Sequence, residues 1–516
     1  MYRSLLSVGG LTILSRGTGF LRDVALSAIL GAGGVADAFV VAFRLPNHFR
    51  AIFGEGAFNS AYVPSYSRVL ETEGPERAKT FASQIFTILL ASQIVLLVLA
   101  MAFTPELVRL LAPGFESDPT KMDHAISMTR ITFPYLLCVT LVTLQSGTLN
   151  ANRRFTAAAF APVLLNVVMV MFLGVAFLFP NAGIAASVGV TVSGVLQLVM
   201  MLVAARRAGV MEKLVRPRWS TDVRRFFRAL GPAVIGSAGV QIAIFADTII
   251  SSMLPTGGPS SIYYAERIYQ LPIGVIGIAA GTVLLPEMSR RLAQGDAGAA
   301  LHVQNRTMAL TLALSAPFFL MFMLMPREIM QGVFQRGQFT AADAAASAAV
   351  LAAYGIGLLP IVLIRSAVAS FQARGDTTTP MIASLAAVAL NLALKLLLYK
   401  PLGAVGLATA TAVGAWINLL ILVTLASLKG TMRLDETLAR VAVAVDVGCL
   451  ALGAFIVLAA PSIEDYARHL TTRGELSLLL IGMPAAALYG VTLLGALWVL
   501  QVKLPGLPRR FVKAKA

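Results

Sequence analysis

The chain has 516 residues, of which 57% are hydrophobic and only 13% charged, and its formal net charge is +16. A soluble domain carries about 25% charged residues, so this composition and a mean hydropathy of +0.80 exclude an ordinary soluble protein. An all-α polytopic membrane protein is predicted instead. The basic excess does not indicate nucleic-acid binding, because the cations are dispersed over many short loops without interleaved aromatic residues.

Fourteen windows are long and apolar enough to cross a bilayer, which takes about 20 residues each. In chain order they are 5–30, 35–62, 81–103, 126–149, 157–179, 184–205, 230–254, 262–285, 308–325, 344–371, 381–399, 402–428, 441–460 and 476–502. We therefore expect fourteen transmembrane helices.

Lysine and arginine are distributed unequally over the loops between these windows. With the amino terminus placed inside, the cytoplasmic loops hold 26 of the 41 cations and the opposite loops hold 7. Short cytoplasmic loops carry the excess of positive charge, so both termini are predicted to be cytoplasmic. Anionic membrane lipids are the expected partners of these loops.

An internal repeat relates the two halves of the chain. Asn166 and Asn391 occupy matching places 225 residues apart, and the Leu-Pro pairs at 45–46 and 271–272 give an offset of 226. Six helices separate equivalent positions, so the copies have the same orientation in the membrane. We predict an N-lobe (1–219, helices 1–6), a C-lobe (220–428, helices 7–12), and a segment with helices 13–14 and a basic cytoplasmic tail (429–516).

Eight cations lie inside the apolar windows, and four of them, Arg16, Arg22, Arg44 and Arg50, fall in the first two. A charge at the bilayer centre costs about 2.5 to 3.5 kcal/mol on insertion scales, so such residues usually face a bundle interior or a water-filled cavity. The cluster predicts a buried anion site between the lobes. The alternative for each single arginine is an ion pair with Asp23, Asp37 or Glu55. Guanidinium groups bind phosphate or carboxylate bidentately, and a diphosphate group fits them.

The sequence lacks the residue patterns of metal sites and of nucleotide-binding sites. The two cysteines both lie in apolar windows, the four histidines are scattered, and no Gly-Lys-Ser/Thr phosphate loop occurs. We expect no metal, no cofactor, no nucleotide hydrolysis and no enzymatic activity. Without nucleotide hydrolysis, directional transport by this membrane protein would take its driving force from the membrane potential or an ion gradient.

Several long strings resemble the MurJ (MviN) lipid II flippases, within the multidrug/oligosaccharidyl-lipid/polysaccharide exporter superfamily. They are GFLRDVALSAILGAGGVADAFVVAFRLPN, FGEGAFNSAYVP, GTLNANRRFTAAAFAPVLLN, YYAERIYQLPIGV, GTVLLPEMSR and FQARGDTTTP. The resemblance implies alternating-access transfer of lipid II, the undecaprenyl-diphosphate-linked peptidoglycan precursor, from the inner to the outer leaflet of a bacterial cytoplasmic (inner) membrane. It also implies a monomer that works beside the peptidoglycan-synthesis machinery.

Matching motif positions carry the family's substrate-binding charges onto Arg16, Arg22, Asp23, Asp37, Arg50 and Arg267. Glu55 and Glu266 lie near these positions and are assigned a gating or supporting role, together with Arg44. The family often has a lysine where this chain has Arg44, and some members have an acid where it has Gln270. The resemblance to the family's tail-binding groove in helices 13–14 is weak.

A second polar site is expected in the C-lobe. Asp247, Asn391, Lys395 and Thr411 lie in predicted helices 7, 11 and 12, and related transporters use such positions for sodium. Here Lys395 supplies a cation, so an Asp247–Lys395 ion pair is preferred over a metal-ion site.

Two other functions remain open. An exporter of drugs, small ions or another lipid-linked oligosaccharide fits the same fold, although cationic drugs favour an acidic cavity. A membrane-embedded transferase acting on polyprenyl phosphate needs an acid pair on a cytoplasmic loop or a DD-type metal motif, and the sequence has neither.

Overall fold

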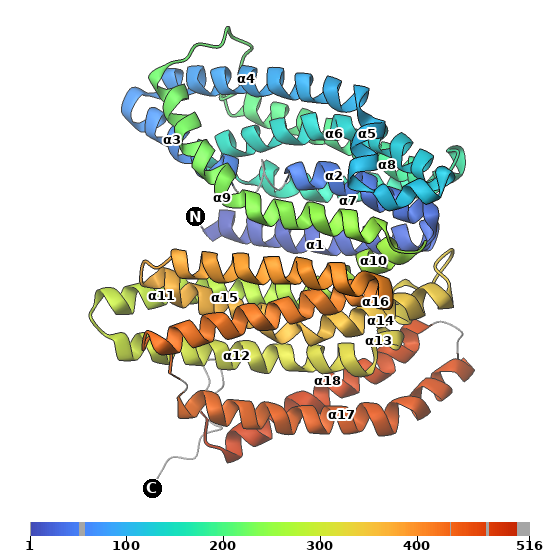
Figure 1. Cartoon of the computed structure of the whole chain (residues 1–516). Helices are drawn as coiled ribbons and strands as arrows, with labels where there is room; N and C mark the ends of the chain where they lie inside the picture. Colours follow the sequence, from blue (N-terminus) through green and yellow to red (C-terminus); the bar gives the residue numbers. More distant parts are fainter. Residues whose placement is uncertain (1, 51–56, 434, 471–473, 503–516) are drawn as a thin grey trace. The chain divides into compact units, whose positions relative to one another are not determined.

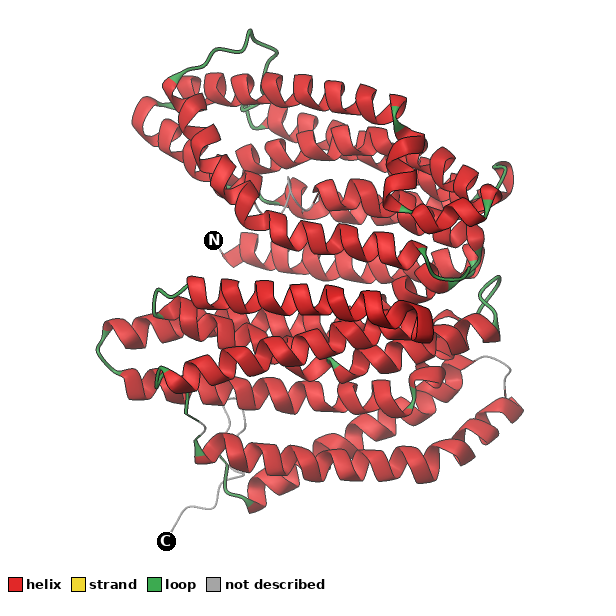
Figure 2. Cartoon of the chain, viewed as in Figure 1, coloured by secondary structure: helices red, strands yellow, loops and turns green. Residues whose placement is uncertain are grey.

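The computed structural model describes residues 2–50, 57–433, 435–470 and 474–502. In these ranges the chain is helical, and the helices are joined by loops and turns without a strand (Figures 1 and 2). Ten of the described helical segments are long and apolar enough to cross a membrane. The all-α polytopic class is thereby confirmed, while the count of fourteen spans stays a prediction.

The chain forms two compact units. Unit 1 comprises Met1–Ser260 and Gly337–Phe339, and unit 2 comprises Ser261–Arg336 and Thr340–Ala516. The boundary falls after the helix that the repeat assigns to the start of the C-lobe. The two units are defined by packing, whereas the predicted lobes at 1–219 and 220–428 are defined by the sequence repeat. The lobes therefore stay a prediction.

Unit 1 contains nine α-helices and two short 3-10 helices among its described residues. They are α1 (Tyr2–Leu30), α2 (Gly34–Arg50), α3 (Ala57–Glu73), α4 (Pro75–Ala102), α5 (Thr104–Leu111), η2 (Pro113–Ser117), α6 (Pro119–Ala151), α7 (Thr156–Gly174), η3 (Ala176–Leu178), α8 (Ala182–Arg207) and α9 (Thr221–Ser252). Helix α6 packs against α2, α3, α4 and α8. Most of its apolar window is buried, whereas only a small part of the α4 window is, as expected of a helix facing lipid.

Aromatic side chains fill the core where α3, α4 and α9 meet. Tyr62 stacks on Phe58 with ring centroids 5.3 Å apart and on Phe81 at 6.0 Å, and Phe226 meets Tyr62 edge-on at 6.1 Å. Such pairs are worth about 0.5 to 1.5 kcal/mol beyond the area they bury. This cluster fixes the first turns of α9 beside α3.

Unit 2 contains the remaining helices, with the first turn of α10 at its boundary. They are α10 (Gly258–Pro272), η4 (Ile273–Gly277), α11 (Ile278–Ala293), α12 (Ala297–Leu324), α13 (Pro326–Phe334), α14 (Ala341–Ile356), α15 (Leu358–Ala373), α16 (Thr378–Leu428), α17 (Glu436–Leu470) and α18 (Gly474–Val499). The π-turn of η4 lies between α10 and α11, directly after Pro272.

The segment α16 consists of two helices that meet at Gly403, whose φ of 56° and ψ of −134° are not helical. Glycine adopts this positive φ without the penalty that a Cβ would add. A Cβ on Gly406 would lie 2.4 Å from the Leu398 carbonyl oxygen, and one on Gly414 would lie 3.0 Å from Cβ of Asn391. The two halves therefore fold back on each other, as the separate windows 381–399 and 402–428 predict.

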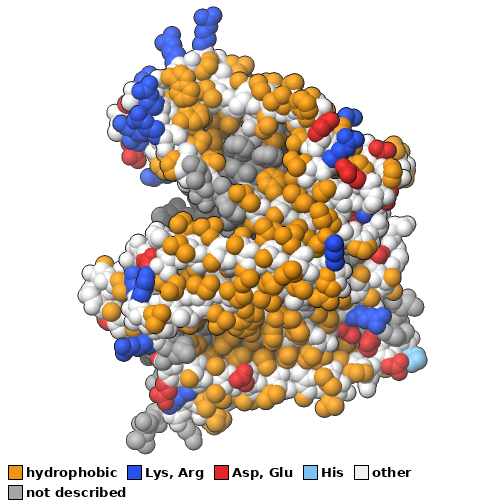
Figure 3. All heavy atoms as spheres, in the orientation of Figure 1, with side chains coloured by type: hydrophobic (Ala, Val, Ile, Leu, Met, Phe, Trp, Pro, Cys, Tyr) orange, Lys and Arg blue, Asp and Glu red, His pale blue; other side chains and the backbone are white. Residues whose placement is uncertain are grey.

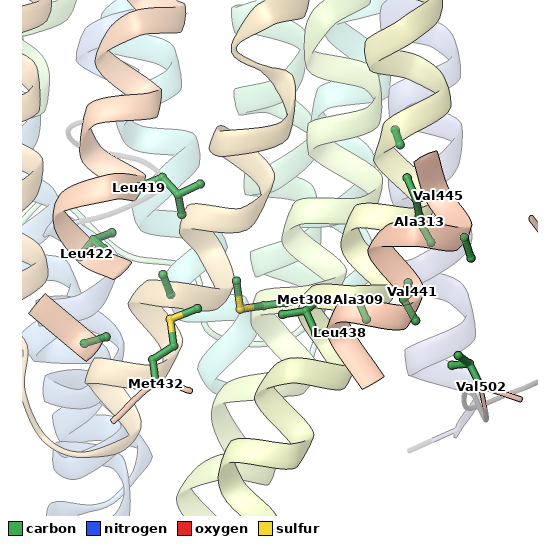
Figure 4. Close-up of a cluster of buried hydrophobic side chains, with 14 of the residues drawn as sticks. Met308, Ala309, Ala313, Leu419, Leu422, Met432, Leu438, Val441, Val445 and Val502 are labelled. Atoms are coloured by element: carbon green, nitrogen blue, oxygen red, sulfur yellow. The ribbon is translucent and has the colours of Figure 1, made fainter. Parts of the chain in front are cut away.

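The two C-terminal helices, α17 and α18, belong to unit 2, and an apolar cluster joins α17 to α12. Leu438, Val441 and Val445 of α17 approach Met308 and Ala309 of α12 (Figure 4). On the face drawn in Figure 3, hydrophobic side chains cover the lengths of the helices, and lysine and arginine gather toward the helix ends. This distribution is the one a bilayer imposes.

Candidate functional site

Arg22 lies buried in unit 1, in the C-terminal third of helix α1. Its Nε and Nη2 donate to Oδ1 of Asp23 at 3.1 and 2.7 Å, and its Nη1 donates to Oδ1 of Asn166 in α7 at 3.0 Å. The guanidinium also lies 5.8 Å from the ring centroid of Phe43 in α2. Three helices thus hold one arginine in a fixed orientation.

Asn166 connects this arginine to the backbone of α1. Its Nδ2 donates to the Ser15 carbonyl oxygen at 3.1 Å and to Oγ1 of Thr18 at 3.2 Å. A Cβ on Gly19 would come within 3.3 Å of the same Nδ2. The small residue allows α7 to approach α1 closely enough for the amide to orient Arg22.

Asp37 of α2 forms a second buried ion pair. Its Oδ2 lies 3.0 Å from Nζ of Lys121 in α6 and accepts from the Gly257 amide at 2.8 Å. Its Oδ1 accepts from the amide and the hydroxyl of Ser260, at 3.0 and 2.8 Å. The carboxylate is fully buried, so a direct substrate contact requires this cluster to open.

Lys121 is held from the other side as well. Its Nζ donates to Oγ1 of Thr256 at 3.2 Å and lies 4.7 Å from the centroid of the Phe115 ring. The pair therefore joins α2 and α6 to the turn after α9, all within unit 1.

A nearby turn closes around two glycines with positive φ. Gly31 has φ 66°, and a Cβ there would lie 2.6 Å from the Gln338 carbonyl oxygen. Gly337 has φ 57°, and the Gln338 amide donates to the Ala28 carbonyl at 2.8 Å. The 337–339 segment thus packs on the end of α1 and belongs to unit 1.

The other arginines of the first two helices differ in their surroundings. Arg16 is exposed on α1. Arg44 is half-buried, and its Nη1 donates to Oγ of Ser251 in α9 at 3.3 Å. Arg50 ends α2, but its side chain and Glu55 lie outside the described residues.

In unit 2, Arg267 and Glu266 lie on α10. The Arg267 guanidinium stacks over the Tyr263 ring at 4.5 Å. Oε1 of Glu266 accepts from Nε2 of Gln270 at 2.8 Å, one turn along the helix. Gln270, where some family members have an acid, is therefore a hydrogen-bond partner of Glu266 here. Convergence of Arg267 with the unit 1 arginines stays a prediction.

The predicted second polar site divides between the two units. Asn391, Lys395 and Thr411 lie on the two halves of α16, and Lys395 is buried. Asp247 lies on α9 of unit 1, so its pairing with Lys395 stays a prediction. Among the described residues, no group of three or more histidine, cysteine, aspartate or glutamate side chains is arranged to hold a metal ion.

Three of the structural partners were not singled out as site residues from the sequence. Lys121 lies in a loop of the predicted topology, Asn166 marks the internal repeat, and Glu212 lies among the cations of a predicted cytoplasmic loop. The signal for Asn166 was present in its matching place with Asn391. The partnership of Lys121 with Asp37 spans 84 positions of sequence and has no local signature.

Comparison with solved structures shows which known fold the chain shares. The chain superposes on a structure titled "Lipid II flippase MurJ, inward closed conformation" with a TM-score of 0.77 and 23% identity, covering 94% of this chain and 97% of that one. An inward-facing multidrug resistance MATE family transporter of the MOP superfamily gives a TM-score of 0.67 at 13% identity, over 81% and 94% of the two chains. The chain therefore shares the multi-helix fold of these two structures.

Sequence comparison then gives the family. The family model described as "Lipid II flippase MurJ" matches residues 26–473. The protein named "Probable lipid II flippase MurJ" of Rhizobium meliloti (strain 1021) is 41% identical over 82% of this chain and 80% of its own. Its namesake from Rhizobium tropici is 36% identical over 100% of this chain and 97% of its own. The chain belongs to the MurJ lipid II flippase family, which confirms the resemblance drawn from the sequence motifs.

Proposed function

We propose that this chain transfers lipid II from the inner to the outer leaflet of the cytoplasmic membrane by alternating access. The observation that carries the proposal is membership of the MurJ family over residues 26–473. The fold supports it, and so does a buried arginine that Asp23 and Asn166 hold in a fixed orientation, Asn166 lying on α7, one of the ten apolar helices.

The substrate-binding set is proposed to be Arg16, Arg22, Asp23, Asp37, Arg50 and Arg267. A diphosphate partly withdrawn from water needs cationic, geometrically fixed donors. Arg22 has this character, because Asp23 and Asn166 hold three of its nitrogens at 2.7 to 3.1 Å. Asp37 is proposed to reach the substrate only when its cluster opens, since its carboxylate is buried between α2, α6 and the turn after α9.

Transport is proposed to proceed without a resident cofactor and without covalent catalysis, driven by membrane potential or an ion gradient. One elementary charge moved through 100 mV changes the free energy by about 2.3 kcal/mol. We further propose a monomer with both termini in the cytoplasm, whose basic loops contact anionic lipid headgroups.

Complementation tests the function in cells. A bacterium depleted of its own lipid II flippase should regain growth and normal shape when it expresses this chain, and should fail with Arg22→Ala at equal membrane abundance. Export of a cationic dye should not change between the two strains. Dye export that depends on Arg22, without rescue of growth, would instead favour the drug-exporter alternative.

A further inference from the structure

Glu212 lies in the segment that connects α8 to α9 (residues 208–220, the α8–α9 connector). It is the one buried residue of this described segment, whose other residues are exposed or half-buried. Only 3% of its surface is exposed. Its Oε2 accepts from Nε2 of Gln145 at 2.6 Å, and its Oε1 accepts from Oγ1 of Thr148 at 2.8 Å. The connector therefore inserts one carboxyl group against helix α6.

The partners of Glu212 differ from those of the other buried acids in unit 1. Asp23 pairs with Arg22, Asp37 with Lys121 and Asp222 with Arg68, at 2.7 to 3.0 Å. Within the described parts of the chain, Glu212 forms no ion pair, and its two side-chain partners are a neutral amide and a neutral hydroxyl. A buried carboxylate without a cation is costly and usually takes up a proton.

The electrostatic surroundings favour the neutral acid. Burial raises the pKa of Glu212, against the lowering effect of the hydrogen bonds from Thr148, from its own backbone and from Gln145. The titratable groups that interact with it are Tyr62 and Tyr66 of α3, and neither supplies a positive charge near neutral pH. From α4, the connector meets the uncharged Ser83, Gln84 and Thr87.

The charged residues near Glu212 do not neutralise a negative charge on its carboxyl group. Lys213, the next residue, is exposed. Arg68 of α3 and Asp222 of α9 pair with each other at 2.9 Å.

The hydrogen-bond network can accept the extra proton. Oε1 of Gln145 is buried and has no hydrogen-bond partner among the described residues. A half-turn of the amide presents this oxygen to a protonated Glu212, which then donates where the carboxylate accepted. The Thr148 hydroxyl is also shared with the Tyr62 hydroxyl at 2.8 Å, so it can reorient with either state.

The same connector is fastened to α4 through its backbone. The Lys213 amide donates to Oγ of Ser83 at 3.0 Å, and the Val215 amide donates to Oγ1 of Thr87 at 3.1 Å. These two amides lie one and three residues after Glu212 in the chain, so release of the carboxyl group from α6 loosens the attachment to α4.

We propose that Glu212 is a proton-binding site, and that the bound proton fastens the α8–α9 connector onto α4 and α6. The attached state binds the proton more tightly than the detached state, in which glutamate has its ordinary pKa of about 4.3. Attachment is therefore strongest at low pH. It weakens as pH rises above this value, until the attached carboxyl group also loses its proton.

Hydrogen exchange of the full-length protein in lipid nanodiscs tests the proposal. The protection factors of the Lys213 and Val215 amides, corrected for the intrinsic effect of pH, should fall about tenfold or more between about pH 5 and about pH 8. Glu212→Gln stays neutral and should keep its protection over this range. Glu71→Gln removes an exposed acid of α3 and should behave like the unmodified protein.

A second variant moves the titration in a known direction. Thr148→Val deletes a hydrogen bond that favours the charged form, so the loss of protection should continue to higher pH than in the unmodified protein. Constant protection of the unmodified protein across the range, or a fall in Glu212→Gln equal to that of the unmodified protein, would overturn the proposal. The readout needs no transport, so its outcome is independent of whether the protein flips lipid II.

Discussion

Lys121→Met should destabilise unit 1 because it leaves the buried carboxylate of Asp37 without its cation. Removing one partner of a buried pair costs about 3 to 5 kcal/mol. Three hydrogen bonds from Gly257 and Ser260 remain on the carboxylate, so we expect a loss near the lower limit, about 3 kcal/mol. The thermal unfolding midpoint of the detergent-purified protein should then fall by several degrees.

The matched control is the exposed pair of Arg77 and Glu73, whose side chains are 51% and 38% exposed. Arg77→Met should leave the midpoint nearly unchanged, because solvent screens such pairs. The double variant Lys121→Met with Asp37→Asn removes both charges and should recover part of the loss. If Lys121→Met were no more harmful than Arg77→Met, the buried pair could not be a stabilising link.

Three further changes have defined outcomes. Arg22→Lys keeps the charge but loses the forked donors, so lipid II transfer should fall about tenfold or more, while charge counting alone predicts no change; leaflet-exchange rates decide between them. Gly31→Ala should lower the unfolding midpoint, because φ is 66° and a backbone oxygen lies 2.6 Å from the new Cβ. Gly33→Ala in the same turn has open space and should not; equal midpoints would contradict the steric argument. If Asp247 and Lys395 form an ion pair, Lys395→Ala should impair transport, and the double variant Lys395→Ala with Asp247→Asn should restore part of it. Sodium-dependent transport by the unmodified protein that disappears in Asp247→Asn would instead indicate a sodium site.

The helical class and the family were predictable because both depend on local sequence. Apolar windows report the helices directly, and strings such as FQARGDTTTP carry the family motif without any knowledge of contacts. The reversal inside α16 was also predictable, since Pro401 and Gly403 interrupt the apolar pattern between two windows. The interruptions at η4 and at Gly357, between α14 and α15, were not predicted, because apolar windows continue across both.

The partners of the charged residues were less accessible. Arg22 and Asp23 are neighbours in sequence, so their pairing was among the alternatives, but the second hydrogen-bond partner of Arg22, Asn166, lies 144 residues away. Lys121 illustrates the same limit. From the sequence it is one of the lysines and arginines that mark the loops of a membrane protein, and only the fold shows that it pairs with Asp37. Glu212 was hidden among eight loop cations, although burial separates it from all of them.

Leaflet exchange of fluorescent lipid II in proteoliposomes tests the central claim most directly. The purified full-length chain should make inner-leaflet lipid II accessible to an impermeant quencher faster than empty liposomes do, and a phosphatidylcholine probe of similar size should not be accelerated. Arg22→Ala should abolish the difference at equal reconstitution. Exchange no faster than in empty liposomes, under an imposed membrane potential and with sodium and proton gradients of either direction, would contradict the assignment.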